Sequence, residues 1–209
     1  LGVLGLGSVF MGPYSNIIQQ LMLEGRVELA AVYDVEPTKT AAVADRHPGV
    51  ATPGSPDELI DGDVDVVLVL TSMNEHGPLA TRARAAGKHV LVEKPMATTI
   101  PEADELLAVD AANDGLLVCA PHILLSPTYR RMHAAVQAGE IGRLVLARAR
   151  YGWAGPWWGD WFYRPGGGAL FDLGVYNLTS LCGMFGPVRR VAAMVGTAIP
   201  SRMSERRMI

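Results

Sequence analysis

The chain of 209 residues is long enough to bury one large or two modest cores, and 49% hydrophobic beside 19% charged residues is typical of a globular protein. The net charge of −3 and the scattered Lys and Arg residues argue against a nucleic-acid-binding surface, and no apolar run reaches the roughly 18 residues of a membrane span. Cys119 and Cys182 lie in apolar surroundings, which favours reduced thiols and a cytoplasmic location.

The first part of the chain alternates short apolar runs with longer segments of helical periodicity. The apolar runs, which predict strands, are residues 1–7, 27–34, 64–71, 88–94 and 115–121. The predicted helices between them are residues 13–24, 37–46, 76–86 and 99–113. Strands that are apolar throughout are typical of a sheet covered on both faces, and strict alternation implies parallel strands with right-handed crossovers. The prediction is an α/β fold with a doubly wound parallel sheet, a Rossmann domain over residues 1–121.

A glycine-rich segment, GLGSVFMG at residues 5–12, follows the first predicted strand and opens the first predicted helix. Glycines with this spacing allow a tight turn and a close approach of the backbone to a pyrophosphate at the helix N-terminus. Phe10 stands where the third glycine of the fingerprint is expected, and Gly12 follows two residues later. The predicted cofactor contacts are Gly5, Gly7, Ser8, Val9 and Phe10. The alternative is an ordinary structural turn.

Asp34 ends the second predicted strand, where an acid typically binds the ribose hydroxyls of a dinucleotide. The alternatives are a solvated acid and a capping role for the helix that starts near Pro37. Asp34 and Glu36 have no adjacent Arg and would repel a 2′-phosphate, so the sequence favours NAD over NADP, although Lys39 lies close in the chain.

After about residue 121 the pattern of elements changes. A predicted helix at 126–139 is followed by a strand-like segment at 143–153, a Trp-, Gly- and Pro-rich loop, a helix within GGGALFDLGVYNL at 166–178, and a strand-like segment at 188–196. This mixture predicts a second, α+β domain over residues 122–209.

Four motifs in this order, GLGSVFMG, TSMNEH, GKHVLVEKP and GGGALFDLGVYNL, make the chain similar to the Gfo/Idh/MocA oxidoreductase family. The resemblance implies an N-terminal Rossmann domain and a C-terminal domain on an open, mostly antiparallel sheet. It implies a homodimer or homotetramer that pairs through the exposed face of that sheet. The chain begins inside a predicted strand and ends without a terminating signal, so we expect the last part of the sheet to lie outside it.

The resemblance also implies the catalytic residues. Lys94 is the lysine of the EKP motif, which in the family lies beside the nicotinamide and the reacting carbinol, and Asp172 matches the family's helix aspartate. Tyr176 stands where many members carry a histidine. A tyrosine there resembles the branch that includes glucose-fructose oxidoreductase, dihydrodiol dehydrogenase and some aldose dehydrogenases.

Elementary chemistry supports these residue types. Oxidation of an alcohol by hydride transfer needs a base for the hydroxyl proton and a positive charge beside the developing alkoxide. Tyrosine ionises near pH 10 in water, and an ammonium such as that of Lys94 favours the phenolate. Asp172 and Tyr176 are one helical turn apart, so both face one cleft. The alternatives are a solvated Lys-Pro turn and a tyrosine that packs in the core.

Further candidates follow from position. Residues expected to contact the cofactor are Thr71, Ser72, Asn74 and His76, with capping of a helix as the alternative for His76. The resemblance adds Glu93, which precedes Lys94 and in the family contacts the cofactor or the lysine. Residues expected to contact substrate are His122, Trp161 and Arg164, together with Asp172 and Tyr176, and the loop also carries Trp153, Trp157, Trp158 and Tyr163. The alternatives are a structural histidine and aromatic residues at a subunit contact. No metal-ligand spacing appears, so no metal is predicted.

The predicted function is an NAD(P)-dependent dehydrogenase or reductase that transfers a hydride between a nicotinamide cofactor and a sugar, polyol or related cyclic alcohol or ketone. Two alternatives remain open at this point. One is an NAD-assisted glycosidase or lyase of the same family. The other is a nucleotide-binding regulatory protein that keeps the fold without the chemistry.

Overall fold

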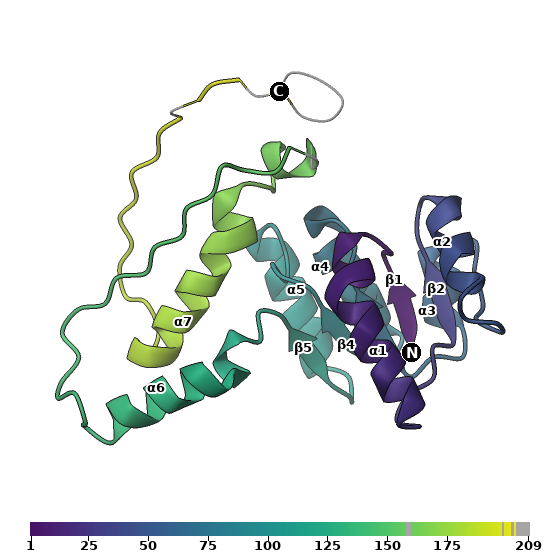
Figure 1. Cartoon of the computed structure of the whole chain (residues 1–209), viewed down its shortest axis with the longest axis horizontal. Helices are drawn as coiled ribbons and strands as arrows, with labels where there is room; N and C mark the ends of the chain where they lie inside the picture. Colours follow the sequence, from purple (N-terminus) through teal and green to yellow (C-terminus); the bar gives the residue numbers. More distant parts are fainter. Residues whose placement is uncertain (158–159, 198, 202, 204–209) are drawn as a thin grey trace. The chain divides into compact units, whose positions relative to one another are not determined.

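A computed structural model describes residues 1–157, 160–197, 199–201 and 203, and the chain divides into two compact units, Leu1–Ala120 and Pro121–Ile209. The first unit contains a five-stranded parallel sheet (Figure 1). Its strands are β1 (Gly2–Leu4), β2 (Ala31–Tyr33), β3 (Val66–Val69), β4 (His89–Val92) and β5 (Leu117–Cys119). The main helices are α1 (Ser15–Leu23), α2 (Pro37–Ala44), α3 (Pro56–Asp61), α4 (Met73–Ala85) and α5 (Ile100–Ala111).

The strand order is β2-β1-β3-β4-β5, so the chain moves outward in opposite directions from β1 and from β3. This is the doubly wound topology, and each of the five predicted strands contains one of the observed strands, which confirms the predicted α/β fold. Ala51, which belongs to no named strand, forms an isolated parallel bridge to Ala31 of β2. The boundary between β1 and β3 is the topological switch point, where ligands of such sheets bind beyond the carboxyl ends of the strands.

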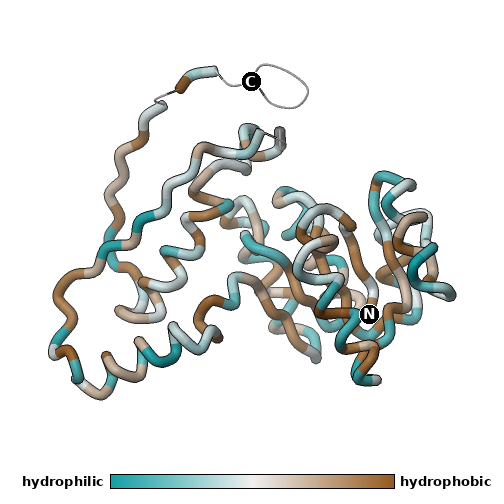
Figure 2. The backbone as a smooth tube through the Cα atoms, in the orientation of Figure 1, coloured by the Kyte–Doolittle hydropathy of each residue, from teal (hydrophilic) through white to brown (hydrophobic). Residues whose placement is uncertain are grey.

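Different helices pack on the two faces of the sheet. This explains why the strands consist almost entirely of apolar residues, which are brown in Figure 2. On one face Leu4, Val67, Val69, Val90 and Val92 pack with Leu59, Ile60, Ala80, Ala83 and Leu106 of α3, α4 and α5. On the other face Val3, Val32 and Leu68 pack with Phe10, Ile18 and Val43 from the segments before and within α1 and α2. Alternate side chains of a strand point to opposite faces, so both layers are built from the same short strands.

Helix starts follow the local chemistry of the sequence. The hydroxyl of Ser55 accepts a hydrogen bond from the Glu58 N–H at 3.1 Å, and that of Thr99 accepts one from the Glu102 N–H at 3.3 Å. Proline follows within the first two helical positions in α2, α3 and α5, where a missing N–H costs nothing. The sequence did not predict α3, because six residues are too few to show a period.

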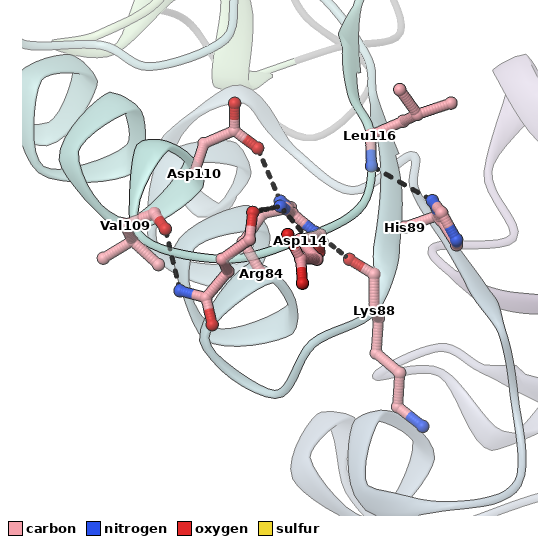
Figure 3. Close-up of polar contacts among 8 residues, drawn as sticks. Arg84, Lys88, His89, Val109, Asp110, Asp114 and Leu116 are labelled. Carbon is pink, nitrogen blue, oxygen red and sulfur yellow. Dashed lines mark hydrogen bonds and ion pairs between the residues drawn. The ribbon is translucent and has the colours of Figure 1, made fainter.

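Arg84 is fully buried at the end of α4, and its guanidinium bonds to the segments that precede β4 and β5 (Figure 3). Its guanidinium donates to the carboxylate of Asp110 at 2.7 Å and to the carbonyl of Lys88 at 2.6 Å. It also donates to the carbonyls of Asn113 at 2.9 Å and Asp114 at 3.2 Å. The charge is therefore compensated, and α4, the end of α5 and the start of β4 are joined by one side chain.

The second unit is helical in its described part. It contains the short 3₁₀ helices η2 (Ile123–Leu125) and η3 (Asp160–Tyr163), the helices α6 (Pro127–Gln137) and α7 (Val175–Phe185), and the π-helical turn η4 (Leu170–Gly174). The buried Tyr129 of α6 donates its hydroxyl hydrogen to the carbonyl of Ser180 in α7 at 3.0 Å. This contact joins α6 to α7 within the second unit.

The predicted strands at 143–153 and 188–196 are wrong for this structure, which assigns no strand to either segment. Both segments are exposed through most of their length, with Val145 at 78% and Val195 at 96% exposed. A strand forms only where a neighbouring strand accepts and donates its backbone hydrogen bonds, and these segments have no such neighbour among the described residues. The helix predicted at 166–178 begins at Leu170 and runs on to Phe185.

Candidate functional site

The glycine turn after β1 is packed tightly on its inner side. Gly5 has φ +93°, and its N–H donates to the carbonyl of Tyr33 at 2.9 Å. A Cβ on Gly5 would lie 2.6 Å from the carbonyl oxygen of Leu70, which follows β3. Only glycine lets the ends of β1 and β3 approach this closely.

The outer side of the same turn is open. A Cβ on Gly7 would meet no atom within 4 Å among the described residues, and Ser8 and Val9 are exposed. The carbonyl of Gly7 accepts a hydrogen bond from Met11 N at 2.9 Å, so a helical turn begins here, and the first N–H groups of a helix have no carbonyl partner within it. This is the arrangement that a dinucleotide pyrophosphate requires, so the residues present fit such a group.

Phe10 begins the π-helical turn η1 (Phe10–Tyr14) and is only 2% exposed. Its side chain packs in the core with Val3, Leu6 and Ile18. Any contact that Phe10 makes to a cofactor therefore goes through its backbone. The apolar core contact explains why a large side chain replaces the third glycine of the fingerprint.

Asp34 lies beside the glycine turn, with its side chain 7% exposed. Its Oδ2 accepts the Leu6 N–H at 2.7 Å and its Oδ1 accepts the Glu36 N–H at 2.9 Å. Lys39 Nζ is 3.7 Å from Asp34 and 2.9 Å from Glu36. The carboxylate thus joins the end of β2 to the turn after β1. Glu36 occupies the cap position of α2, so Asp34 does not cap this helix, which was an alternative to ribose binding.

The predicted cofactor residues after β3 differ in their surroundings. Ser72 and Asn74 are exposed at the start of α4, where the Asn74 amide donates to Glu75 at 2.9 Å, and Thr71 is half-buried. His76 is 2% exposed, in the second turn of α4. The cap position of this helix is held by Ser72, so His76 does not cap it.

His76 connects the ends of two strands. Its Nδ1 lies 2.8 Å from the carbonyl oxygen of Pro95, and its Nε2 lies 3.0 Å from that of Thr71. Burial lowers the pKa of His76, opposed by these two carbonyls and by Glu93, while Lys94 lowers it further. A neutral imidazole has one N–H and donates to only one of the two carbonyls.

Glu93 and Lys94 follow β4 at the same edge of the sheet, and both are half-buried. Glu93 Oε1 accepts the hydroxyl hydrogen of Tyr14 at 2.9 Å, and Glu93 Oε2 accepts the backbone N–H of Lys94 at 2.9 Å. The Lys94–Pro95 peptide bond is cis. Sequence reasoning missed Tyr14, because its partner lies 79 positions away and no local pattern marks the pair.

Cys119 lies at the end of β5, near Glu93. Burial raises the pKa of its thiol to about 11, and the charge of Glu93 raises it too. Its Sγ donates to the carbonyl of Ala120 at 2.9 Å. The thiol is therefore in its neutral, protonated form at neutral pH.

Asp172 and Tyr176 lie in the second unit, in η4 and α7, and both are half-buried. The Asp172 N–H donates to the carbonyl of Gly168 at 3.0 Å. The glycines before them have an internal packing role: a Cβ on Gly167 would collide with the backbone carbonyl of Trp161. The close approach that the glycine run permits is to η3, within the second unit.

The aromatic residues before the glycines form a cluster around Phe162, which is 8% exposed. Trp153 and Trp161 each lie edge-on to it with ring centroids 5.9 Å apart, and the Tyr163 centroid is 5.1 Å away. Trp161 is half-buried and Trp157 is exposed. Trp158 lies outside the described residues.

The other predicted substrate residues of the second unit are exposed. His122 precedes η2, and Arg164 follows η3. The predicted cofactor residues and Lys94 thus belong to the first unit, whereas Asp172, Tyr176, His122, Trp161 and Arg164 belong to the second. A contact between Lys94 and Tyr176 stays a prediction. Among the residues described, no cluster of three His, Cys, Asp or Glu side chains has the geometry to hold a metal, and no helix is long and apolar enough to cross a membrane.

Comparison with known families gives a match for each unit. Residues 1–120 match the oxidoreductase family with an NAD-binding Rossmann fold, and residues 129–207 match the GFO/IDH/MocA C-terminal domain.

The names of individual relatives refer to sugars and cyclic diols. The chain is 32% identical to dTDP-3,4-didehydro-2,6-dideoxy-alpha-D-glucose 3-reductase of Actinomadura kijaniata, over 88% of this chain and 55% of that protein. It is 34% identical to trans-1,2-dihydrobenzene-1,2-diol dehydrogenase of Mus musculus, over 64% of this chain and 40% of that protein. The chain spans about half the length of the curated relatives it matches.

A solved structure extends the similarity to the fold. GenD2 from gentamicin A biosynthesis, in complex with NAD, is 28% identical with a TM-score of 0.71, over 88% of this chain and 53% of that chain.

Proposed function

The chain belongs to the GFO/IDH/MocA oxidoreductase family, and on that premise we propose that it is an NAD-dependent dehydrogenase or reductase of a sugar, polyol or related cyclic alcohol. The observation that carries the proposal is the glycine turn at the switch point of the sheet. It is closed against β3 at Gly5, open at Gly7, and bordered by the carboxylate of Asp34.

The cofactor half of the proposal rests on the first unit. The N–H groups that begin at Ser8 would bind the pyrophosphate, and Asp34 would accept the hydroxyls of the adenosine ribose. In this proposal the carboxylates of Asp34 and Glu36 would lie beside the extra phosphate of NADP, and Lys39 is the one cation bonded to them among the described residues. We therefore favour NAD over NADP.

The chemical steps are assigned to three side chains. A nicotinamide cofactor held at the glycine turn would supply the hydride acceptor for the carbinol carbon. Tyr176 takes the hydroxyl proton, the Lys94 ammonium stabilises the developing alkoxide, and Asp172 accepts a hydrogen bond from the substrate or from Lys94. The assignment requires the two units to bring Lys94 and Tyr176 to one substrate.

The substrate class is proposed from the relatives and from the aromatic cluster. Two of the named relatives are a reductase of a dTDP-linked didehydro-dideoxy sugar and a dehydrogenase of a dihydrobenzene diol, so both names give a ring as the substrate. Trp161 and Arg164 would contact the ring face and hydroxyls, with His122 beside them. We further propose a homo-oligomer, and a cytoplasmic location supported by two free thiols.

The test is a screen of sugars, inositols and their oxidised forms with NAD and with NADP, followed by the absorbance of the reduced nicotinamide. The proposal expects turnover with NAD, and at least a 10²-fold loss in Lys94→Ala without loss of NAD binding. Turnover that survives Lys94→Ala would contradict the assigned chemistry. Aryl glycosides complete the screen, since release of aglycone without net NADH would indicate a glycosidase.

A further inference from the structure

We propose that Tyr14 is a positioning residue for Lys94 and acts through the carboxylate of Glu93. The inference rests on the proposed function, in which Lys94 stabilises the alkoxide. It starts from two hydrogen bonds on one carboxylate. The Tyr14 hydroxyl donates to Oε1 of Glu93, and the backbone N–H of Lys94 donates to Oε2, both at 2.9 Å.

The two hydrogen bonds connect segments that the sheet keeps apart. Tyr14 ends the π-helical turn η1 after β1, whereas Glu93 and Lys94 follow β4, and β3 lies between β1 and β4 in the sheet. The backbone of Glu93 is already fixed, because its N–H donates to the carbonyl of Val69 in β3 at 2.9 Å. Its side chain is held from the other side by Tyr14. The bridge therefore runs from the nucleotide-binding turn to the catalytic lysine.

Both carboxylate oxygens are used, which determines the rotation of the group. A half-buried carboxylate that accepts from two sides has one orientation, and charge-assisted hydrogen bonds of this kind are the strong ones. Without the Tyr14 hydroxyl, the carboxylate turns toward solvent and its hold on the Lys94 N–H weakens. The backbone of Lys94, and with it the position of the Lys94 side chain, is then less well fixed.

Loss of this restraint lowers the rate and leaves cofactor binding in place. A catalytic group displaced by about 1 Å costs on the order of 10²-fold in rate, and a loosened one costs less, about tenfold. Tyr14 is replaced by Phe, which removes the hydroxyl and keeps the ring. The expected result is a kcat about tenfold lower and a Kd for NAD within about twofold of the wild type.

A second measurement needs neither cofactor nor substrate. Hydrogen exchange at the Lys94 amide of the free protein, followed by NMR or mass spectrometry, reports the bond to Glu93 directly. Tyr14→Phe is expected to speed this exchange about tenfold. Unchanged exchange at Lys94 would overturn the proposal.

The matched control is Tyr33→Phe, in β2 of the same unit. Tyr33 is half-buried against the core, and within the described part of the chain its hydroxyl makes no hydrogen bond. This variant is expected to leave both kcat and the exchange of the Lys94 amide unchanged. Equal effects of the two variants would show a general loosening of the unit and would overturn the proposal.

A double-mutant cycle tests the route. In a Glu93→Ala background, Tyr14→Phe should have no further effect on kcat or on the exchange of Lys94, because the carboxylate through which Tyr14 acts on Lys94 is gone. An equal effect in both backgrounds would mean that Tyr14 acts by another route, and the proposal would be wrong. The exchange results stand whether or not Lys94 proves catalytic, so a failure of the proposed function is distinguishable from a failure of this inference.

Discussion

The carboxylate of Asp34 accepts the Leu6 N–H at 2.7 Å and so fixes the glycine turn after β1 against the end of β2. The same side chain accepts the Glu36 N–H. Asp34 is therefore a structural link of the turn as well as the proposed ribose acceptor, and the two roles make separate predictions.

Replacing Asp34 by Ser and Val35 by Arg should shift the preference from NAD toward NADP, because the carboxylate that opposes the 2′-phosphate is replaced by a cation. Val35 is 81% exposed, so the new side chain meets no core. The loss of two accepted hydrogen bonds should also lower the free energy of unfolding by about 1–3 kcal/mol. Titration with both cofactors and urea denaturation measure the two effects. Val35→Arg alone is the control, and a wild type that binds NADP more tightly than NAD would contradict the cofactor assignment.

Gly5→Ala and Gly7→Ala should separate folding from binding. At Gly5 the positive φ and the contact with Leu70 make any Cβ destabilising, by about 1–3 kcal/mol, so the melting temperature should fall. At Gly7 the Cβ has open space, so the variant should fold as the wild type does while losing affinity for NAD, because the methyl group lies on the ligand side. Calorimetry of both variants with NAD titration checks this. Unchanged NAD affinity in Gly7→Ala would place the cofactor elsewhere.

His76 should make stability depend on pH. Burial lowers its pKa in the folded protein below the ordinary 6.5, so in the interval between these two values the unfolded chain binds more protons. Above pH 6.5 the imidazole is neutral in both states and does not make stability depend on pH. Below pH 6.5 the free energy of unfolding falls as the pH decreases through that interval. Urea denaturation at several pH values should show a smaller decrease for His76→Gln than for the wild type. The exposed His122 provides the control variant, His122→Gln, which should keep the wild-type slope.

Arg84→Met should destabilise the first unit far more than Arg82→Met. The buried guanidinium of Arg84 compensates Asp110 and several carbonyls, and removing such a partner costs about 3 kcal/mol. Arg82 pairs with Asp57 and Asp61 at the surface, where an ion pair contributes below about 1 kcal/mol. Denaturant unfolding of the two variants compares them. Equal losses would contradict the assigned role of the buried network.

Tyr176→Phe should keep NAD binding and folding and lose about 10²- to 10⁴-fold in turnover, as expected for removal of a general base. If Tyr176 and Lys94 act on one proton, the double variant should be little worse than the worse single one, whereas independent residues give additive losses. Stopped-flow or steady-state rates on a substrate identified by the screen decide this. Wild-type turnover in Tyr176→Phe at every pH would leave the phenol a packing residue.

Local pattern determined the α/β fold of the first unit. The continuous apolar runs become β1 to β5 because both faces of the sheet are covered, and the glycines at 5 and 7 identify the turn at its edge. Each of these features depends on residues within one strand, turn or helix, so neighbours in the sequence are enough to reveal it. The motifs likewise were enough to predict the family.

Only the tertiary structure decided the contacts between distant segments. The pairing of Tyr14 with Glu93, the two carbonyls that face His76 and the buried network of Arg84 join residues far apart in sequence, and hydrogen bonds between them leave no periodic trace. In the segments 143–153 and 188–196 the local sequence predicted strands that the structure does not contain. Their composition favours strands, but a strand exists only where a neighbour pairs with its backbone, and that is a property of the assembled chain.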